Sequence, residues 1–197
     1  CLHWGVPAPR VLLIALYELG HQPFGVASAA AWLRDAGCEV SCVDLAVETL
    51  FDETVGGADV VAVHLPMHTA TRLATTLVPR LHALNASARL CFFGLYAPMN
   101  AALLHALGAH AVLGGEFEQD LVAFVLGGSR AAATSISLAR QQFLLPDRST
   151  LPALERYARL QDGALERIPG YTEATRGCGR RCRHCPVVPA VSYTHSE

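Results

Sequence analysis

Short apolar runs alternate with helix-like apolar repeats along the first part of the chain. Residues 11–17 are continuously apolar, which is typical of a strand buried on both faces of a sheet. Residues 25–36 carry apolar side chains at helical spacing, and Gly37 follows them as a C-cap residue. The same pattern predicts further strands at 39–44, 59–63, 89–93 and 111–113, and further helices at 69–84, 101–107 and 117–126.

This alternation predicts an α/β fold in which about five parallel strands carry helices on both faces. Pro79 is expected to kink or break the helix at 69–84. In open sheets of this kind, ligands bind outside the carboxyl ends of the strands. Those ends correspond to the loops at 18–25, 64–69, 94–99 and 114–118, whose unusual polar residues, His21, His68, Tyr96 and Glu116, are the candidate cofactor-binding residues.

Two common nucleotide-binding motifs do not occur in these loops. No Gly-x-Gly-x-x-Gly follows the first strand, and no glycine-rich loop ends in Gly-Lys-Ser or Gly-Lys-Thr. The sequence therefore gives little support to binding of a nicotinamide dinucleotide or a nucleoside triphosphate.

The composition is that of a folded protein with a sizeable core. Hydrophobic residues make up 52% of the 197 residues, charged residues 16%, and the formal net charge is -2. These values exclude a disordered chain and argue against a dedicated nucleic-acid binder, which carries a basic excess. No apolar run approaches the roughly 20 residues of a membrane-spanning helix, and no stretch has the pattern of a secretory signal. We expect a cytoplasmic protein that binds neither nucleic acid nor membrane.

The chain is expected to divide into a domain at 8–128, a connector at 129–168 and a new unit from 169 onward. The connector is rich in small polar and turn residues, with one short helix expected at 152–160. A strand is expected at 171–175. Because the chain neither begins with Met nor ends after a complete element, we expect it to be a fragment.

Three cysteines close to the end of the chain carry the strongest chemical signal. Cys178, Cys182 and Cys185 have the spacing C-x3-C-x2-C, so their thiolates can converge on one inorganic centre. Cysteine usually supplies all four corners of a [4Fe–4S] cluster, and three cysteines leave one iron open. Scattered cysteines such as Cys38 and Cys91 are instead expected to be small buried hydrophobic residues.

Two alternatives to an iron–sulfur cluster remain for this motif. A structural zinc site needs four ligands, and His184 or His195 would have to supply the fourth, because no second cysteine pair is present. Free thiols are the other alternative, but three of them so close together would be prone to oxidation.

The cysteine motif after an expected strand resembles the signature of the radical S-adenosylmethionine (SAM) enzymes. In that family the three cysteines, here Cys178, Cys182 and Cys185, ligate a [4Fe–4S] cluster whose open iron binds SAM. The resemblance implies reductive cleavage of SAM to a 5′-deoxyadenosyl radical, with electrons from a donor such as flavodoxin or ferredoxin. An aromatic residue is common before the third cysteine of the family, and His184 stands there in this chain.

The order of the parts is similar to that of radical SAM proteins with an N-terminal cobalamin-binding domain. The stretches at 17–23, 114–118 and 182–189 resemble the CUAEP/CCAEP-tail radical SAM subgroup. The resemblance implies a flavodoxin-like (Rossmann-like) doubly wound sheet at 8–128 and, at 169–197, the first strand and cluster loop of a truncated radical SAM barrel.

The corrinoid-binding motif Asp-x-His-x-x-Gly is absent from the first domain. Leu19 stands where the Asp would precede His21, and the following glycine is Gly25, one position too far. Two alternatives therefore stay open: cobalamin bound without a histidine ligand, or no cobalamin at all.

The resemblance thus implies a radical SAM enzyme that acts on a small-molecule or peptide substrate, with a [4Fe–4S] cluster and SAM as cofactors and cobalamin as a further candidate cofactor. The 197-residue chain alone is expected to be inactive. A non-catalytic module that binds a corrinoid or another small molecule is one alternative, and a zinc-binding regulatory protein is another. Neither the substrate nor the catalytic residues follow from the sequence.

Overall fold

Six parallel strands form the sheet of the computed structural model, which describes residues 7–127, 133–173 and 176. The strands lie in the order β2-β1-β3-β4-β5-β6, and each pairs in parallel with its neighbours. The first five have the doubly wound order 2-1-3-4-5, which confirms the predicted fold class. The strands are β1 (Arg10–Ala15), β2 (Glu39–Asp44), β3 (Val60–His64), β4 (Arg89–Phe93), β5 (Ala111–Gly115) and β6 (Ala133–Ser137).

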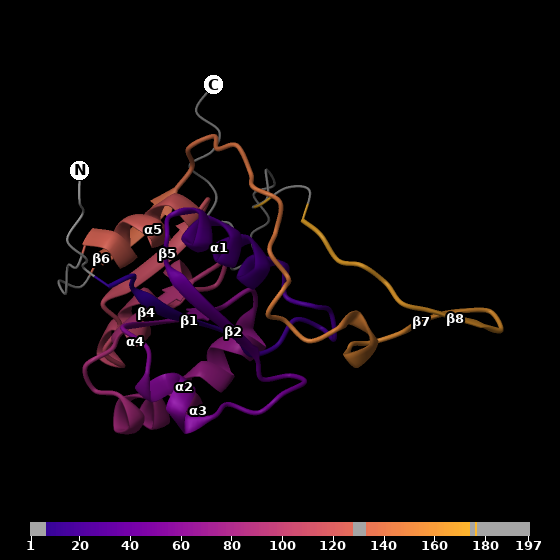
Figure 1. Ribbon diagram of the computed structural model, residues 1–197, viewed down its shortest axis with the longest axis horizontal. Coiled ribbons are helices and arrows are strands. Elements are labelled where there is room, and N and C mark those ends of the chain that lie inside the picture. The colour runs from indigo at the N-terminus through magenta and orange to yellow at the C-terminus, as the bar shows by residue number, and fades with distance from the viewer. Residues whose placement is uncertain (1–6, 128–132, 174–175, 177–197) are drawn as a thin grey trace.

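Helices cover both faces of this sheet (Figure 1). One face carries α1 (Phe24–Asp35) and α5 (Glu118–Gly127), which also contact each other. The other face carries α2 (Asp52–Gly56), α3 (His68–Leu84) and α4 (Ala101–Ala106). A short 3-10 turn, η1 (Pro98–Asn100), precedes α4.

Two apolar cores lie on the two sides of the sheet. Leu13 and Phe93 belong to the core beneath α1 and α5, whereas Leu12 and Phe92 belong to the core beneath α3 and α4. Neighbouring residues of one strand point to opposite faces, so a strand between two cores must be apolar at every position. This requirement explains why the continuous apolar runs in the sequence correctly predicted buried strands.

The sixth strand comes from a region that the sequence pattern assigned to the connector. Strand β6 pairs with β5 from Ala111↔Ala133 to Gly115↔Ser137. It forms an edge of the sheet, and its first residues, Ala133 and Thr134, are exposed. An edge strand with one exposed end does not need the continuous apolar run that marks the central strands, so pattern analysis did not detect it.

Two further local expectations differ from the structure. Helix α3 continues from His68 to Leu84 and is not broken at Pro79. Pro79 lies on the exposed side of the helix, where water can satisfy the backbone carbonyl that proline leaves without a donor. At 152–160 the chain forms only the 3-10 turn η2 (Leu154–Arg156), not a full helix.

After β6 the described part of the chain, up to residue 173, runs along the body and adds no strand to the main sheet. A small antiparallel hairpin, β7 (Leu160–Asp162) and β8 (Leu165–Arg167), projects away from the body (Figure 1). Residues 171–173 then return to the carboxyl edge of the sheet without forming a strand, and 174–175 lie outside the described residues. The predicted cluster ligands Cys178, Cys182 and Cys185 also lie outside the described residues.

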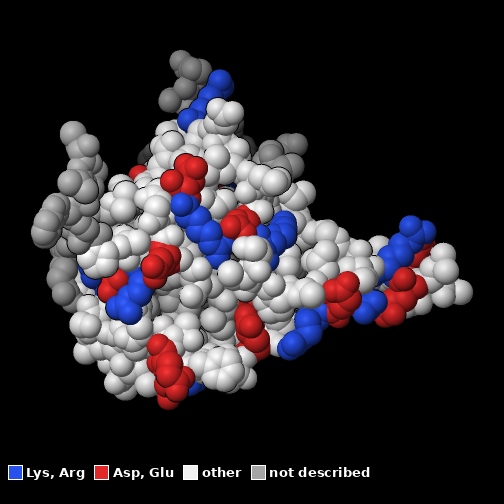
Figure 2. All heavy atoms as spheres, in the orientation of Figure 1, with Lys and Arg blue, Asp and Glu red and all other residues white. Residues whose placement is uncertain are grey.

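Acidic and basic side chains are interspersed on the face shown in Figure 2, including the projecting hairpin. On that hairpin Arg167 pairs with Asp162 at 3.1 Å, and Glu166 lies 3.9 Å from Arg159. None of the helices in the described ranges combines the length and the apolar character that crossing a bilayer requires.

Candidate functional site

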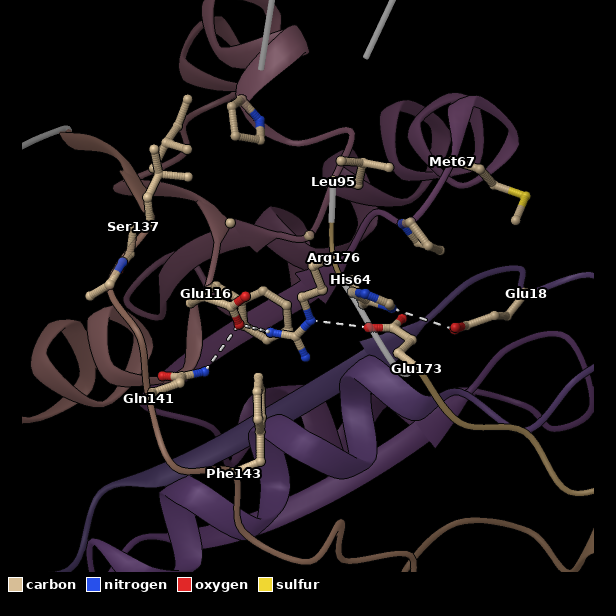
Figure 3. A pocket seen from close by; sticks show the side chains of 18 of the residues that line it. Glu18, His64, Met67, Leu95, Glu116, Ser137, Gln141, Phe143, Glu173 and Arg176 are labelled. Carbon is tan, nitrogen blue, oxygen red and sulfur yellow. Dashed lines mark hydrogen bonds and ion pairs between the residues drawn. The ribbon is translucent and has the colours of Figure 1, made fainter. Parts of the chain in front are cut away.

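A cavity of about 700 Å³ opens at the carboxyl edge of the sheet (Figure 3). Its walls are the loops that follow β1, β3, β4 and β5, the chain around the end of β6, and Tyr171, Glu173 and Arg176 of the returning segment. This is the edge at which doubly wound sheets bind their ligands. Much of the wall is apolar and includes Pro66, Met67, Leu95, Pro98, Ile136 and Leu138.

The guanidinium of Arg176 stands among the polar groups of the cavity (Figure 3). It donates from Nη2 to Glu118 Oε1 at 2.6 Å and from Nη1 to Glu118 Oε2 at 2.7 Å, which makes a bidentate pair. Its Nε donates to Glu173 at 3.0 Å, and Nη1 also lies 3.3 Å from Glu116. The fork of an arginine matches a carboxylate in this way, so Arg176 fixes its own segment to the start of α5.

Two aromatic rings complete the environment of this arginine. The Arg176 guanidinium carbon lies 4.4 Å from the centroid of the Phe117 ring and 5.4 Å from that of Phe143. Cation–π contacts of this length add to the ion pair and exclude water from it. Phe117 precedes Glu118 in the chain, so the loop between β5 and α5 supplies both a ring and a carboxylate to Arg176.

The pKa values of Glu116 and Glu118, two of the carboxylates around Arg176, are shifted in opposite directions. Burial by itself raises the pKa of the fully buried Glu118, but hydrogen bonds and charge from Arg176, with hydrogen bonds from Ser28 and Gln141, bring this pKa below its ordinary value. Burial raises the pKa of Glu116 above its ordinary value, and Arg176 offsets only part of that rise. Glu118 is therefore the firmly ionised partner of the arginine.

The charge of Arg176 is maintained although the side chain is largely buried. Burial works to lower the pKa of Arg176, but the hydrogen bonds and charges of Glu118 and Glu173 bring it above the ordinary value. A buried cation is tolerated only when it is paired and hydrogen-bonded. Arg176 meets this condition and carries its charge at every physiological pH.

A second buried polar pair lies in another part of the cavity wall. His64 Nδ1 and Glu18 Oε2 are 3.5 Å apart, and their side chains are only 4% and 6% exposed. Neither atom has a hydrogen-bond partner within the described part of the chain. His64 ends β3 and Glu18 lies shortly after β1, so the pair bridges two neighbouring strands of the sheet.

The position of the His64 ring depends on two glycines. A Cβ atom on Gly25 would lie 2.3 Å from His64 Nε2, and one on Gly94 would lie 2.9 Å from His64 Cδ2. No real side chain fits at such distances, so the imidazole occupies space that only glycine leaves free. The rings of Phe93 and Phe117, at centroid distances of 5.0 and 6.2 Å, pack against His64 as well.

The returning segment makes a second contact with the cavity through Tyr171. Its ring stacks on His21 with a centroid distance of 4.9 Å and an interplanar angle of 13°. Burial, followed by the charges of Glu173 and Glu18, raises the pKa of Tyr171, so that its hydroxyl stays protonated. The backbone turn that presents His21 includes Leu19 in the left-handed region, with φ 53°.

The comparisons with known proteins include a structural likeness of low sequence identity. No protein-family model matches the chain, and no curated protein matches it. Among solved structures, the chain is similar to the radical S-adenosylmethionine methyltransferase TsrM from Kitasatospora setae, solved with cobalamin and a [4Fe–4S] cluster bound. The TM-score is 0.48 at 16% identity, and the match covers 61% of this chain and 26% of that chain. The chain thus spans about a quarter of the TsrM chain, and the assignment of function depends on its own residues.

The four candidate residues from the loops lie in two places. His21 and Glu116 line the cavity. His68 and Tyr96 face each other with ring centroids 6.5 Å apart and are not among the residues that line it. In the described ranges, no three His, Cys, Asp or Glu side chains are grouped closely enough to hold a metal ion.

Four residues of the site were not among the sequence candidates. Glu18 and His64 end two apolar runs at the start of expected loops, and this position was their only signal. Glu118 lies within the expected loop at 114–118, two residues after the candidate Glu116. Arg176 carried no usable signal, because all 15 basic residues of the chain are arginine.

Proposed function

We propose that this chain forms part of a radical SAM enzyme in which Cys178, Cys182 and Cys185 hold a [4Fe–4S] cluster next to the cavity of the α/β domain. The spacing C-x3-C-x2-C is the observation that carries the proposal. Its donor set suits the group, because three thiolates leave one iron of a cubane cluster open. When reduced and bound to SAM, such a cluster supplies the electron for cleavage of the sulfonium cofactor.

The attachment of Arg176 supports a functional link between the motif and the cavity. Cys178 follows Arg176 by two residues in the sequence, and two extended residues span about 7 Å. Arg176 itself is held in the cavity wall by Glu118, Glu116 and Glu173. The proposed role of Arg176 is therefore to position the start of the cysteine motif at the rim of the cavity.

The cavity is the proposed site of a small-molecule cofactor or substrate, with cobalamin as the first candidate. Its volume of about 700 Å³ lies in the usual range for ligand pockets, about 300–1,000 Å³. Apolar walls with a few buried polar groups are typical of such pockets. The residues of the chain contribute binding and orientation here, and the wall formed by Tyr171 and Arg176 restricts the access of water.

Anaerobic reconstitution with iron and sulfide tests the cluster assignment. We expect about four irons and four acid-labile sulfides per chain, an electron paramagnetic resonance (EPR) signal after reduction, and a change in that signal when SAM is added. Cys178→Ala, Cys182→Ala and Cys185→Ala should each lose the cluster. Cys38→Ala is the matched control, because Cys38 is buried in the core beneath α1. Absence of labile sulfide, or cysteine variants with unchanged cluster content, would contradict the proposal.

A non-catalytic module that binds a small molecule is the second candidate function. The observation in its favour is that the described residues which line the cavity, from Glu18 to Arg176, include apolar walls and buried polar groups typical of a ligand pocket. Retention of hydroxocobalamin by protein that takes up no iron and sulfide would favour this alternative. Zinc without labile sulfide in anaerobically purified protein would favour a zinc-binding regulatory protein instead.

A further inference from the structure

Glu18 and His64 have hydrogen-bonding capacity that the described part of the chain does not use. Both side chains line the cavity and both are more than nine-tenths buried. Their facing atoms, Glu18 Oε2 and His64 Nδ1, are 3.5 Å apart and have no hydrogen-bond partner there. Buried polar groups are normally paired, and an unpaired buried group is costly. The pair therefore calls for a partner that is not part of the described chain.

We propose that Glu18 and His64 form a recognition subsite for a primary carboxamide or amino group of the ligand in this cavity. Such a nitrogen bears at least two hydrogens, so it can donate one hydrogen bond to the carboxylate and another to an imidazole nitrogen that carries no hydrogen. The inference rests on the proposed function only in that the cavity holds a ligand. It does not depend on the cysteine motif.

The charge of the subsite restricts the group that it accepts. No arginine pairs with Glu18 in the described structure, whereas Arg176 is occupied by Glu118, Glu116 and Glu173. A phosphate or carboxylate at this point would meet the Glu18 carboxylate at close range, and no arginine of the described chain pairs with Glu18 to offset the repulsion. The subsite therefore discriminates against an anionic group and in favour of a neutral or cationic donor.

The histidine of this subsite is held in a fixed orientation. Gly25 and Gly94 leave the space for its ring, and Phe93 and Phe117 pack against it. A side chain fixed in this way loses little conformational freedom when a ligand binds. Substitution of Gly25 by alanine would displace the imidazole without removing any polar group, which provides a test that is independent of charge.

Equilibrium dialysis of the 197-residue chain with three probes tests the selectivity. Hydroxocobalamin offers primary carboxamides, adenosine offers an amino group, and flavin mononucleotide ends in an anionic phosphate. We expect hydroxocobalamin or adenosine to bind, which identifies the source of the donor, and flavin mononucleotide to bind at least tenfold more weakly. Failure of both donor probes, or preferential binding of the flavin, would overturn the proposal.

Three variants and two matched controls locate the binding of the successful probe. Glu18→Gln and His64→Gln should each weaken it about tenfold or more, as expected when a charge-assisted or buried hydrogen bond is lost. Glu39→Gln, at the exposed amino end of β2, should leave it unchanged. Gly25→Ala should weaken it, whereas Gly56→Ala should not, because a Cβ on Gly56 meets nothing within 4 Å. Equal affinities for Gly25→Ala and Gly56→Ala would overturn the proposal even if the Glu18 variant failed to fold.

The result can be separated from that of the cluster experiment. Protein with a complete cluster but no affinity for either donor probe would refute the subsite and leave the proposed function standing. Protein that binds a donor probe through Glu18 but takes up no iron and sulfide would support the subsite and refute the radical SAM assignment.

Discussion

The body of the protein and the segment that follows β6 are held in place by different forces. The body, residues 7–127, buries continuous apolar strands between two cores, with side chains such as Leu13 completely inaccessible. The segment at 138–176 exposes most of its large apolar side chains, and Leu145 is 91% exposed. Among the residues of that segment that the structure describes, only Leu151 and Tyr157 are buried.

Polar contacts take the place of a core in the segment after β6. Asp147 pairs with Arg34 of α1 at 2.6 Å, and Gln22 donates to the Pro152 carbonyl at 2.9 Å. Arg176 ends the described part of the segment with its bidentate pair to Glu118. Apolar burial is non-directional and tolerates exchange of similar side chains, whereas these anchors require particular atoms at particular places. The comparison indicates that the body supplies stability and the anchors supply the geometry of the cavity rim.

A matched pair of leucine substitutions tests this comparison most strongly. Leu13→Ala should lower the free energy of unfolding by about 2–5 kcal/mol, because it leaves a cavity in a packed core. Leu145→Ala should change it by less than about 0.5 kcal/mol, as is usual for exposed positions. Urea denaturation followed by circular dichroism measures both values. Similar losses for the two variants would show that the segment after β6 has a core of its own.

Removal of the charge of Glu118 tests the strongest anchor. Glu118→Gln should lower the free energy of unfolding by about 2–3 kcal/mol, because Arg176 would keep its charge in a buried site with weaker partners. Glu166→Gln is the matched control, since Glu166 is exposed on the hairpin. Limited proteolysis should cleave near residues 171–173 faster in Glu118→Gln than in the control. Unchanged cleavage would mean that contacts other than the Arg176–Glu118 pair hold the segment.

The pH dependence of stability provides a sharper test of the same anchor. The pKa of Glu118 in the folded protein lies below its ordinary value of 4.5. Its contribution is therefore complete above pH 4.5 and is lost as the pH falls through the lower folded value. Denaturation curves from pH 6 to about 3 should show this loss in the wild type and a smaller one in Glu118→Gln.

Glu116 should show the opposite pH dependence to Glu118, because its pKa is shifted in the opposite direction. Its pKa is raised by burial, so its ionisation as the pH increases opposes folding. Glu116→Gln should therefore keep the acid loss that depends on Glu118 and gain stability at neutral pH relative to the wild type. A loss of stability at neutral pH in Glu116→Gln would show that its contact with Arg176 outweighs its burial.

The smallest expected effect on stability concerns two ion pairs, Asp147–Arg34 beside α1 and Asp162–Arg167 on the exposed hairpin. Hydrogen bonds from Ser149 and the charge of Arg34 hold the pKa of Asp147 at about 2. Asp147→Asn should lower the free energy of unfolding by up to about 1 kcal/mol. Asp162→Asn on the exposed hairpin should lower it by less than about 0.5 kcal/mol. Thermal unfolding at low and high salt measures both, and the difference should shrink at high salt. Equal losses would remove the distinction between the two ion pairs.

The strands and their order of succession followed from the sequence because their signals are local. A strand between two cores must be apolar at each position, and residues 11–14 and 60–63 satisfy that rule without reference to the rest of the chain. The loops that follow these strands were identified for the same reason. The edge strand β6 escaped detection, and the short helix expected at 152–160 is only the 3-10 turn η2, since neither segment has a distinctive local pattern.

The residues of the candidate site depended much more on the fold. His64 meets Glu18 across 46 positions, and Arg176 meets Glu118 across 58. In the sequence each of the four is an ordinary polar residue at the end of an apolar run or in a loop. Parallel strands bring their carboxyl ends to one edge of the sheet, and only this arrangement brings the side chains together.

By itself, the sequence determined the alternation of strands and helices and the spacing of Cys178, Cys182 and Cys185. Both are patterns within a few consecutive residues. The local geometry of the backbone is enough to relate them to a strand, a helix or a shared metal site. The tertiary structure alone decided that Arg176 lies in the wall of a cavity and that Glu18 and His64 face each other in the same wall. Such pairings depend on how distant segments pack. The attraction between the charged groups becomes strong only when the fold excludes water from between them.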